Sequence, residues 1–493
     1  MSLSPDARQV LDELRRLRAT DAPTHGGHIL SYVYDSGIAE LDELAGQAAA
    51  LVQPVNGLDP TVFGSVAAME RDLIAFSRDA FGDPTAVGSV TSGGTESCIL
   101  AVKAARDHAG VAPGTGSIVL PSTAHAAFDK AARLLGVRAV RVPVDPTTTA
   151  VSVDAMSEAV ADDTFLLIGS APNYPTGTLD PIERLGALAV DRGMPLHVDA
   201  CLGGFALAWW PDPLPAWDFR VPGVSSISAD LHKYGYAPKG ASVILHRDRD
   251  RHRAGFFAVT DWPGYPVVNP TLLGSRSAAG LAAAWAIVRY LGADGYAGLV
   301  RKIATAASAL RTTVGQIEGL RVTGHPEGPV FAVVADETAD HPIDPHRWSS
   351  AVAAHGFTLQ AQPRYDQSDG TVLPASTHLT ITPVTATVQD ELSAALVAGA
   401  DDARGLPAAT APDTLAGLGD AFASGAITVA DALALPSETV EAALVGAGID
   451  PHTDPSQAAE ALDMPAVIAA IETLPRPVTA KMLAEFLAAY TNP

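Results

Sequence analysis

The sequence predicts an α/β protein built around a mostly parallel sheet. From about residue 61 to residue 300, short apolar runs alternate with helical stretches rich in Ala and Leu. Strands that alternate with helices in this way form parallel sheets with helices on both faces. The chain has 493 residues, which exceeds one ordinary domain, so we expect two or three with large buried cores. The strand candidates are Ser117–Leu120, Phe165–Gly169, Leu196–Val198 and Ser242–Leu245.

Four segments are expected along the chain. Residues 1–60 form an N-terminal helical segment, with helices at Pro5–Arg18 and Ile38–Leu51, and residues 61–300 form the large domain. Residues 301–405 form a smaller α+β domain, and residues 406–493 form an Ala-rich helical extension interrupted by prolines. In the smaller domain we expect helices at Lys302–Glu318 and Val388–Ala400, and strands at Leu320–Thr323, Val330–Val334 and His378–Thr382.

The composition restricts partners and location. Asp and Glu outnumber Lys and Arg by 55 to 32, and the formal charge of −23 disfavours nucleic acid and anionic membranes, although it also serves solubility. Cys98 and Cys201 lack metal-ligand spacing and are too few for a disulfide framework, so we expect no metal site and a reducing compartment. Residues 1–18 lack the apolar core of a signal peptide, and the apolar stretch 278–287 stops at Arg289. These features predict a cytoplasmic protein without stable membrane insertion.

The first segment with chemical potential is Val90-Thr-Ser-Gly-Gly-Thr-Glu-Ser97, followed by a predicted helix at Ile99–Arg106. A Gly-Gly pair lets the backbone approach a ligand closely, and the start of a helix offers free N–H groups that suit a phosphate. A Gly-rich turn capped by Thr95 explains the segment equally well when it is taken alone.

The second segment is Pro195-Leu-His-Val-Asp-Ala-Cys-Leu-Gly-Gly204. Asp199 ends an apolar strand, so its carboxylate points into the crevice where open α/β sheets bind ligands. A carboxylate there can keep a pyridine nitrogen protonated and make the ring an electron sink. Capping of the following turn by Asp199 is an equally common role.

The third segment runs from Ser226 to Gly240 and contains Ala229-Asp-Leu-His-Lys-Tyr-Gly-Tyr236. Lys233 lies between a histidine and aromatic residues, an unusual place for a solvated charge. Desolvation shifts a lysine toward its neutral, nucleophilic form, which can condense with an aldehyde. A phosphate-binding turn, a ring-nitrogen acid and a lysine thus follow one another along one α/β domain.

These three segments resemble the pyridoxal-5′-phosphate (PLP)-dependent sphingosine-1-phosphate lyase family, within the group II decarboxylase relatives of the aminotransferase fold, fold type I. Three segments match the lyase pattern nearly residue for residue: TSGGTES, HVDACLGGF and SISADLHKYGYAPKG. Amino-acid decarboxylases instead carry segments such as HVDAAYAG and PHKW. Further similar stretches are AHAAFDKA, TDWPGYPVVNPTLLGSR and KMLAEFLAAY. The resemblance runs from about residue 25 to the C-terminus.

The resemblance implies a role for individual residues. Lys233 would hold PLP as a Schiff base, Asp199 would pair with the pyridine nitrogen, and His125 would stack on the ring. Gly94, Thr95 and His232 would contact the cofactor phosphate. The alternative for His125 is a polar residue satisfied at a helix start.

Other implied roles concern the substrate and a second subunit. Ser275 would reach the cofactor phosphate of a neighbouring subunit, which implies a homodimer with shared active sites. Lys239 would bind a substrate phosphate, although a lysine after Pro238 could also be a solvated surface residue. Tyr34, or less favourably Tyr32, would enter the site from the N-terminal segment.

One position departs from the family pattern. The lyases carry Asn-Pro-Leu-His-Pro, with the histidine helping to hold the substrate phosphate, whereas this chain reads Asn56-Gly-Leu-Asp-Pro60. An aspartate at position 59 would repel a phosphate dianion, unless it turns away or binds an amine or hydroxyl of another substrate.

The sequence therefore predicts a PLP-dependent carbon–carbon lyase that cleaves a β-hydroxy amine, phosphorylated or not, by retro-aldol chemistry, with Tyr34 or a substrate phosphate as the base. The alternative from the same electron sink is α-decarboxylation of an amino acid. A PLP-binding protein without catalysis is disfavoured because Lys233, Asp199 and His125 are all present.

Overall fold

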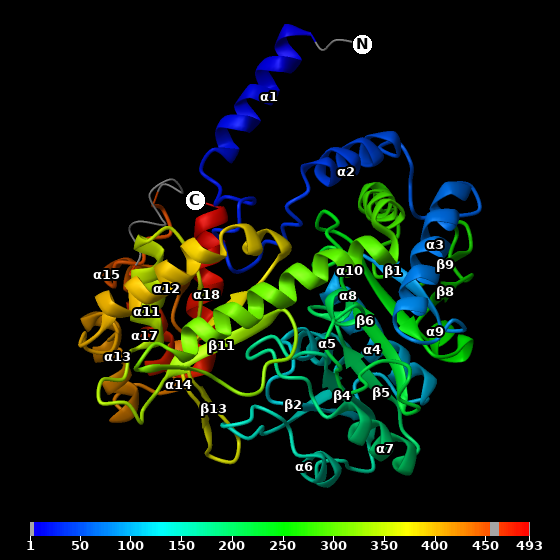
Figure 1. The fold of residues 1–493 in the computed structure, drawn as a ribbon. Helices are drawn as coiled ribbons and strands as arrows, with labels where there is room; N and C mark the ends of the chain where they lie inside the picture. Colours follow the sequence, from blue (N-terminus) through cyan, green and yellow to red (C-terminus); the bar gives the residue numbers. More distant parts are fainter. Residues whose placement is uncertain (1–3, 454–462, 493) are drawn as a thin grey trace.

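The computed structural model describes residues 4–453 and 463–492 (Figure 1). Its centre is a seven-stranded sheet in the order β1-β7-β6-β5-β4-β2-β3. The pairs among β2 to β6 are parallel, while β7 is antiparallel to both β6 and β1. The mostly parallel α/β sheet predicted from the sequence is confirmed. The strands are β1 Val87–Thr91, β2 Ser117–Pro121, β3 Arg138–Val142, β4 Thr164–Ser170, β5 Leu196–Asp199, β6 Val224–Ala229 and β7 Ser242–His246.

The inner strands are buried on both faces, which explains their nearly continuous apolar runs. Helices follow the strands and cover the sheet, and α4 packs against β4, β6 and β7. The helices of this part are α3 Gly64–Ala80, α4 Gly94–His108, α5 Ala127–Leu135, α6 Val153–Glu158, α7 Ile182–Arg192, α8 Gly204–Leu207 and α9 Arg249–Ala254.

A long helix, α10 Ala279–Gly315, crosses the molecule between its two larger parts (Figure 1). Gly292 interrupts it with a positive φ of 56°. Two helices meet at this kink, and the second one begins before Lys302, since Tyr296 and Leu299 are already buried in it. The start of the helix predicted at Lys302–Glu318 is therefore wrong. Since α10 runs across residue 300, the domain boundary expected there stays a prediction.

The smaller sheet has the order β10-β11-β15-β12 and is antiparallel. Its strand predicted at His378–Thr382 begins two residues earlier, because Ser376 and Thr377 pair with β12, a partner distant in sequence. The elements here are β10 Leu320–Val322, β11 Val330–Ala335, β12 Gln360–Gln362, β15 Ser376–Thr380, a small hairpin β13 Tyr365–Asp366 and β14 Val372–Leu373, helices α11 Pro345–Ala354 and α12 Gln389–Ala403, and the 3-10 helix η1 Pro383–Thr387.

The chain ends form helical additions. Helix α1, Pro5–Arg18, matches its prediction, has no buried residue and projects away from the body (Figure 1), whereas α2, Ala39–Leu51, packs on α10. The tail helices enclose an apolar cluster of their own. They are α13 Asp413–Ala423, α14 Val429–Leu433, α15 Ser437–Gly446, α17 Met464–Thr473 and α18 Arg476–Thr491. Among the described residues, no helix combines the length and apolarity needed to cross a bilayer.

Candidate active site

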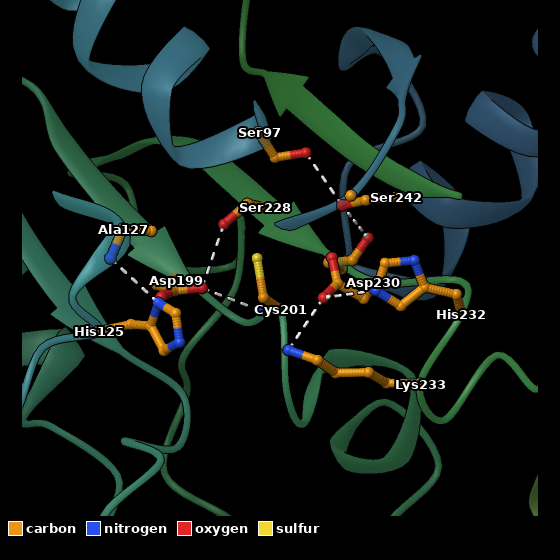
Figure 2. A network of polar contacts seen from close by, with 12 residues as sticks. Ser97, His125, Ala127, Asp199, Cys201, Ser228, Asp230, His232, Lys233 and Ser242 are labelled. Atoms are coloured by element: carbon orange, nitrogen blue, oxygen red, sulfur yellow. Dashed lines mark hydrogen bonds and ion pairs between the residues drawn. The ribbon is translucent and has the colours of Figure 1, made fainter. Parts of the chain in front are cut away.

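Asp199 lies at the carboxyl end of β5, in the middle of the large sheet. Its Oδ1 accepts hydrogen bonds from the Cys201 N–H at 3.0 Å and from the Ser228 hydroxyl at 3.3 Å (Figure 2). The turn-capping role considered for Asp199 is thus real. It coexists with the other role, because Asp199 also lines a cavity.

His197 supports this carboxylate from inside the sheet. Its Nε2 lies 3.2 Å from the Ser228 hydroxyl, and its Nδ1 lies 2.9 Å from the Ser226 hydroxyl. Burial lowers the pKa of His197 to about 4, so the ring is neutral at neutral pH. A chain of His197, Ser228 and Asp199 therefore fixes the position of the carboxylate.

The Gly-Gly turn opens helix α4 directly. Gly93 is the N-cap residue, so the alternative role of Thr95 as the cap is wrong. A Cβ at Gly94 would lie 2.8 and 2.9 Å from the two carboxylate oxygens of Asp230 and 2.9 Å from Cys201 Sγ. Only glycine fits there, and the first N–H groups of α4 have no partner inside the helix.

Lys233 follows β6 and forms a buried ion pair. Its Nζ lies 2.9 Å from Asp230 Oδ2. Figure 2 marks this contact with a dashed line. Desolvation lowers the pKa of Lys233, but the Asp230 carboxylate outweighs it and holds that pKa above its ordinary value. The expectation of a lysine made neutral by desolvation is therefore wrong, because Asp230 stabilises the ammonium.

The two histidines of the motifs also reach this place. His125 Nδ1 accepts from the N–H of Ala127 at the start of α5, which satisfies it as its alternative role foresaw, and its ring still faces the cavity. His232 Nδ1 accepts from the N–H groups of Gly240 and Ala241, at 3.3 and 3.2 Å. The proton of His232 consequently lies on Nε2, which points at Asp230.

A cavity of about 400 Å³ joins these groups. The start of α4, which suits a phosphate, lines this cavity. The carboxylate of Asp199, the imidazole of His125 and the amine of Lys233 line it as well. Ser170 Oγ and Asp230 Oδ1 are buried in its wall without hydrogen-bond partners among the described residues. The residues present thus fit a phosphorylated pyridine aldehyde. Among those lining the cavity are Gly93, Gly94, Thr95, His125, Asp199, Cys201, Asp230, His232 and Lys233.

A second cavity of about 700 Å³ opens from the same lysine. Lys239 Nζ lies 4.6 Å from the centre of the Tyr34 ring and donates to the His232 carbonyl at 3.1 Å. Burial and the nearby charge of Lys233 lower the pKa of Lys239 to about 8. Tyr32 also lines this cavity, so both tyrosines considered from the sequence reach it.

Two predicted residues lie outside both cavities of this chain. Asp59 is exposed, and its Oδ1 accepts from the N–H and hydroxyl of Thr61, so it is turned away as one alternative foresaw. Ser275 accepts from Asn56 Nδ2 at 3.1 Å and lines a separate cavity. A role for either in this chain's own site is not supported.

Sequence reasoning missed three residues of the site. Asp230 stands three positions before Lys233, and that spacing was a usable signal. Tyr174 lines both cavities and stacks on His378 with a centroid distance of 4.4 Å. Ser170 ends the strand beside Asp199, which only the sheet order reveals.

Comparison with known proteins agrees with this geometry. Residues 64–328 match the pyridoxal-dependent decarboxylase conserved domain, more than half of the chain. The chain belongs to this family. Rat sphingosine-1-phosphate lyase 1 is 38% identical over 71% of this chain and 62% of its own length, and the rice sphingosine-1-phosphate lyase is 35% identical over 76% and 69%. The chain thus spans about three fifths of the rat protein.

Solved structures give the same result. A sphingosine-1-phosphate lyase of Burkholderia pseudomallei is 34% identical, with a TM-score of 0.73 over 82% of this chain and 92% of that one. A glutamate decarboxylase of Lactobacillus brevis, at 20% identity and a TM-score of 0.70, shares the fold. The predicted fold type, the resemblance to the lyase family and PLP as the cofactor are confirmed.

Proposed function

We propose that this chain is a PLP-dependent carbon–carbon lyase that cleaves a β-hydroxy amine, with or without a phosphate, by retro-aldol chemistry. The observation that carries the proposal is the convergence of Lys233, Asp199, His125 and the start of α4 on one cavity. The similarity to sphingosine-1-phosphate lyases of several organisms favours this reaction over α-decarboxylation.

The residues around the smaller cavity would hold the cofactor. PLP supplies an aldehyde for covalent attachment and a protonated ring that withdraws electrons from the bond that breaks. Lys233 provides the amine, and Asp199 keeps a proton on the ring nitrogen. His125 would cover the ring face, while Thr95 and His232 would hold the phosphate together with the N–H groups of α4.

The larger cavity would receive the substrate. Lys239 offers positive charge for an anionic group, while much of the wall is apolar. Burial raises the pKa of the Tyr34 phenol, so Tyr34 stays protonated and its hydroxyl is a hydrogen-bond donor for a substrate. Tyr34 is therefore disfavoured as the base that was considered, and a phosphate of the substrate remains the acceptor for the β-hydroxyl proton. The apolar part of the wall includes Tyr32, Pro175, Val334, Leu373 and Pro374.

We propose that two copies form a homodimer with shared sites. Large apolar side chains are exposed along residues 262–273: Trp262 is 44% exposed, Tyr265 59% and Leu272 53%. The same segment leads into Ser275, and Asp59 lies in the loop that packs beside it. In such a dimer both residues would face the partner's site. Sedimentation equilibrium measures the mass directly, and a monomer at active concentration would contradict the dimer.

We also retain the cytoplasm as the proposed location, because Cys98 and Cys201 are free thiols in the described structure. Fractionation of cells that express the chain tests this location.

The test of the reaction is a screen of β-hydroxy amines, with and without a phosphate, for release of aldehyde by protein loaded with PLP. Lys233→Ala is the control and should lose both the visible absorbance of the bound cofactor and turnover. Release of carbon dioxide from amino acids without any aldehyde would establish the decarboxylase instead. Asp59→His should run alongside, since a gain on phosphorylated substrates would show that position 59 sets the preference.

A further inference from the structure

Asp230 is a buried carboxylate that the roles above do not use. It directly follows β6, and its side chain is 1% exposed. Its Oδ2 lies 2.9 Å from Lys233 Nζ and 3.4 Å from His232 Nε2. Its Oδ1 is buried and forms no hydrogen bond among the described residues, and Asp230 lines the smaller cavity. Figure 2 shows the contacts of its other oxygen with Lys233 and His232. A buried charge in this position requires an explanation.

Several neighbours keep Asp230 ionised. Lys233 is a cation, His232 directs its Nε2 proton at the carboxylate, and the positive end of α4 packs so closely that Gly94 admits no Cβ. Desolvation raises the pKa of Asp230, but Lys233 and His232 outweigh it and hold that pKa below its ordinary value. The carboxylate is therefore charged across the neutral range.

Other titratable groups face the Lys233–Asp230 pair without replacing it. Burial raises the pKa of the Tyr34 and Tyr174 phenols. The pKa values of the Cys98 and Cys201 thiols are also raised, so all four groups are neutral near pH 7. Lys239 is a cation and opposes the charge of Lys233. Asp199 shares the cavity but bonds to Cys201 and Ser228. The groups that face the pair are Tyr34, Cys98, Tyr174, Asp199, Cys201, His232 and Lys239.

This ion pair determines when Lys233 can react. Only a neutral amine adds to an aldehyde carbon, so the ammonium must first give up a proton. The new C–N double bond then replaces the C=O bond, and the oxygen leaves as water with two hydrogens. Asp230 Oδ2 lies 2.9 Å from Nζ and stabilises the ammonium, so it opposes the loss of that proton. The proton therefore leaves to solvent, and its loss becomes easier as the pH rises.

We propose that Asp230 is the counterion of Lys233, and that it sets the rate and the pH range in which Lys233 attaches its cofactor. This rests on the proposed function, because it assumes that Lys233 binds PLP. Asp230 acts through Lys233, so it is a positioning residue for that amine.

The experiment mixes PLP-free, full-length protein with PLP and follows the rate at which the visible absorbance of the attached cofactor appears, from pH 6 to pH 10. An opposite charge at this distance typically shifts a pKa by about 1–3 units. We therefore expect Asp230→Asn to move the rise of the rate to lower pH by about 1–3 units and to speed attachment at pH 7 by about tenfold or more. Asp230→Ser, with a smaller side chain, should shift the profile in the same direction if the amide variant folds poorly.

Asp218→Asn is the matched control, because Asp218 is another buried carboxylate, 1% exposed and paired with Arg220, that does not line the cavity. Its profile should overlay that of the wild type. Superimposable profiles for wild type and both Asp230 variants would overturn the role of Asp230 while leaving the proposed function intact. A wild-type protein that attaches no PLP at any pH would overturn both.

Discussion

Gly94→Ala probes the closest contact in the candidate site. The new Cβ would meet both Asp230 carboxylate oxygens and Cys201 Sγ at 2.8–2.9 Å, where ordinary contacts begin at 3.4 Å. Each neighbour must then withdraw by about 0.5 Å, and overpacking of this kind costs about 1–3 kcal/mol. Asp230 cannot withdraw freely, since it is tied to Lys233 at 2.9 Å.

The assay has two parts. Thermal unfolding without PLP should show a lower midpoint for Gly94→Ala, and a PLP titration should show weaker binding, by about tenfold for each 1.4 kcal/mol that falls on the site. Gly46→Ala is the matched control, because Gly46 lies in helix α2 with nothing within 4 Å of its would-be Cβ. There alanine should stabilise the protein by roughly 0.5–1 kcal/mol.

A double variant sharpens the test. Adding Cys201→Ala removes the Sγ that the new Cβ meets at 2.9 Å, so part of the loss in Gly94→Ala should return. Unfolding and PLP titration curves of Gly94→Ala that overlay those of the wild type, with Gly46→Ala behaving as expected, would refute the packing of α4 against Asp230 and Cys201.

Two further predictions concern Lys239 and Ser228 in the site, and a third concerns Asp180, a buried carboxyl that accepts from the Ser170 N–H beside it. Lys239, with a pKa of about 8, loses its charge as the pH rises through that value, so KM for a phosphorylated substrate should rise above pH 8. Lys239→Gln should show a high, flat KM, and an equal pH effect on unphosphorylated substrates would count against the assignment. Ser228→Ala removes a hydrogen bond to Asp199 and should weaken PLP binding by about 0.5–1.5 kcal/mol. An absorbance titration should show this as a roughly two- to tenfold weaker affinity. Unchanged affinity would show that His197 and Ser228 do not support the carboxylate. Burial raises the pKa of Asp180 from 3.8 to about 7, so the folded state binds more protons than the unfolded state between these values and stability falls as pH rises through this window. Asp180→Asn should reduce that fall in thermal unfolding from pH 4.5 to 8, and an unaltered pH dependence would contradict the buried, protonated carboxyl.

Much of the fold could be predicted because its signals are local. The helix at Pro5–Arg18 has a serine before it and a proline at its start, and the structure has the same bounds. The strand at Ser117–Leu120 is a short apolar run buried on both faces. The strand near His378 was misplaced by two residues, because its partner Gln362 lies far away in the sequence. The helix predicted from Lys302 begins earlier, because tertiary packing buries Tyr296 and Leu299 in the part of α10 that follows the kink at Gly292.

The sequence by itself determined which functional groups the site contains: Lys233, Asp199, His125 and a glycine turn before a helix. Their order and local sequence are shared with one family. Residue identity and spacing are enough for this, since each motif spans a few neighbouring residues. Only the tertiary structure decided the state of these groups. The charge of Lys233 depends on a buried carboxylate 2.9 Å away. The positions of Asp59 and Ser275 outside the two cavities at Lys233 depend on where their loops pack. Ionisation and access are set by burial and distance, which the order of residues along a chain does not specify.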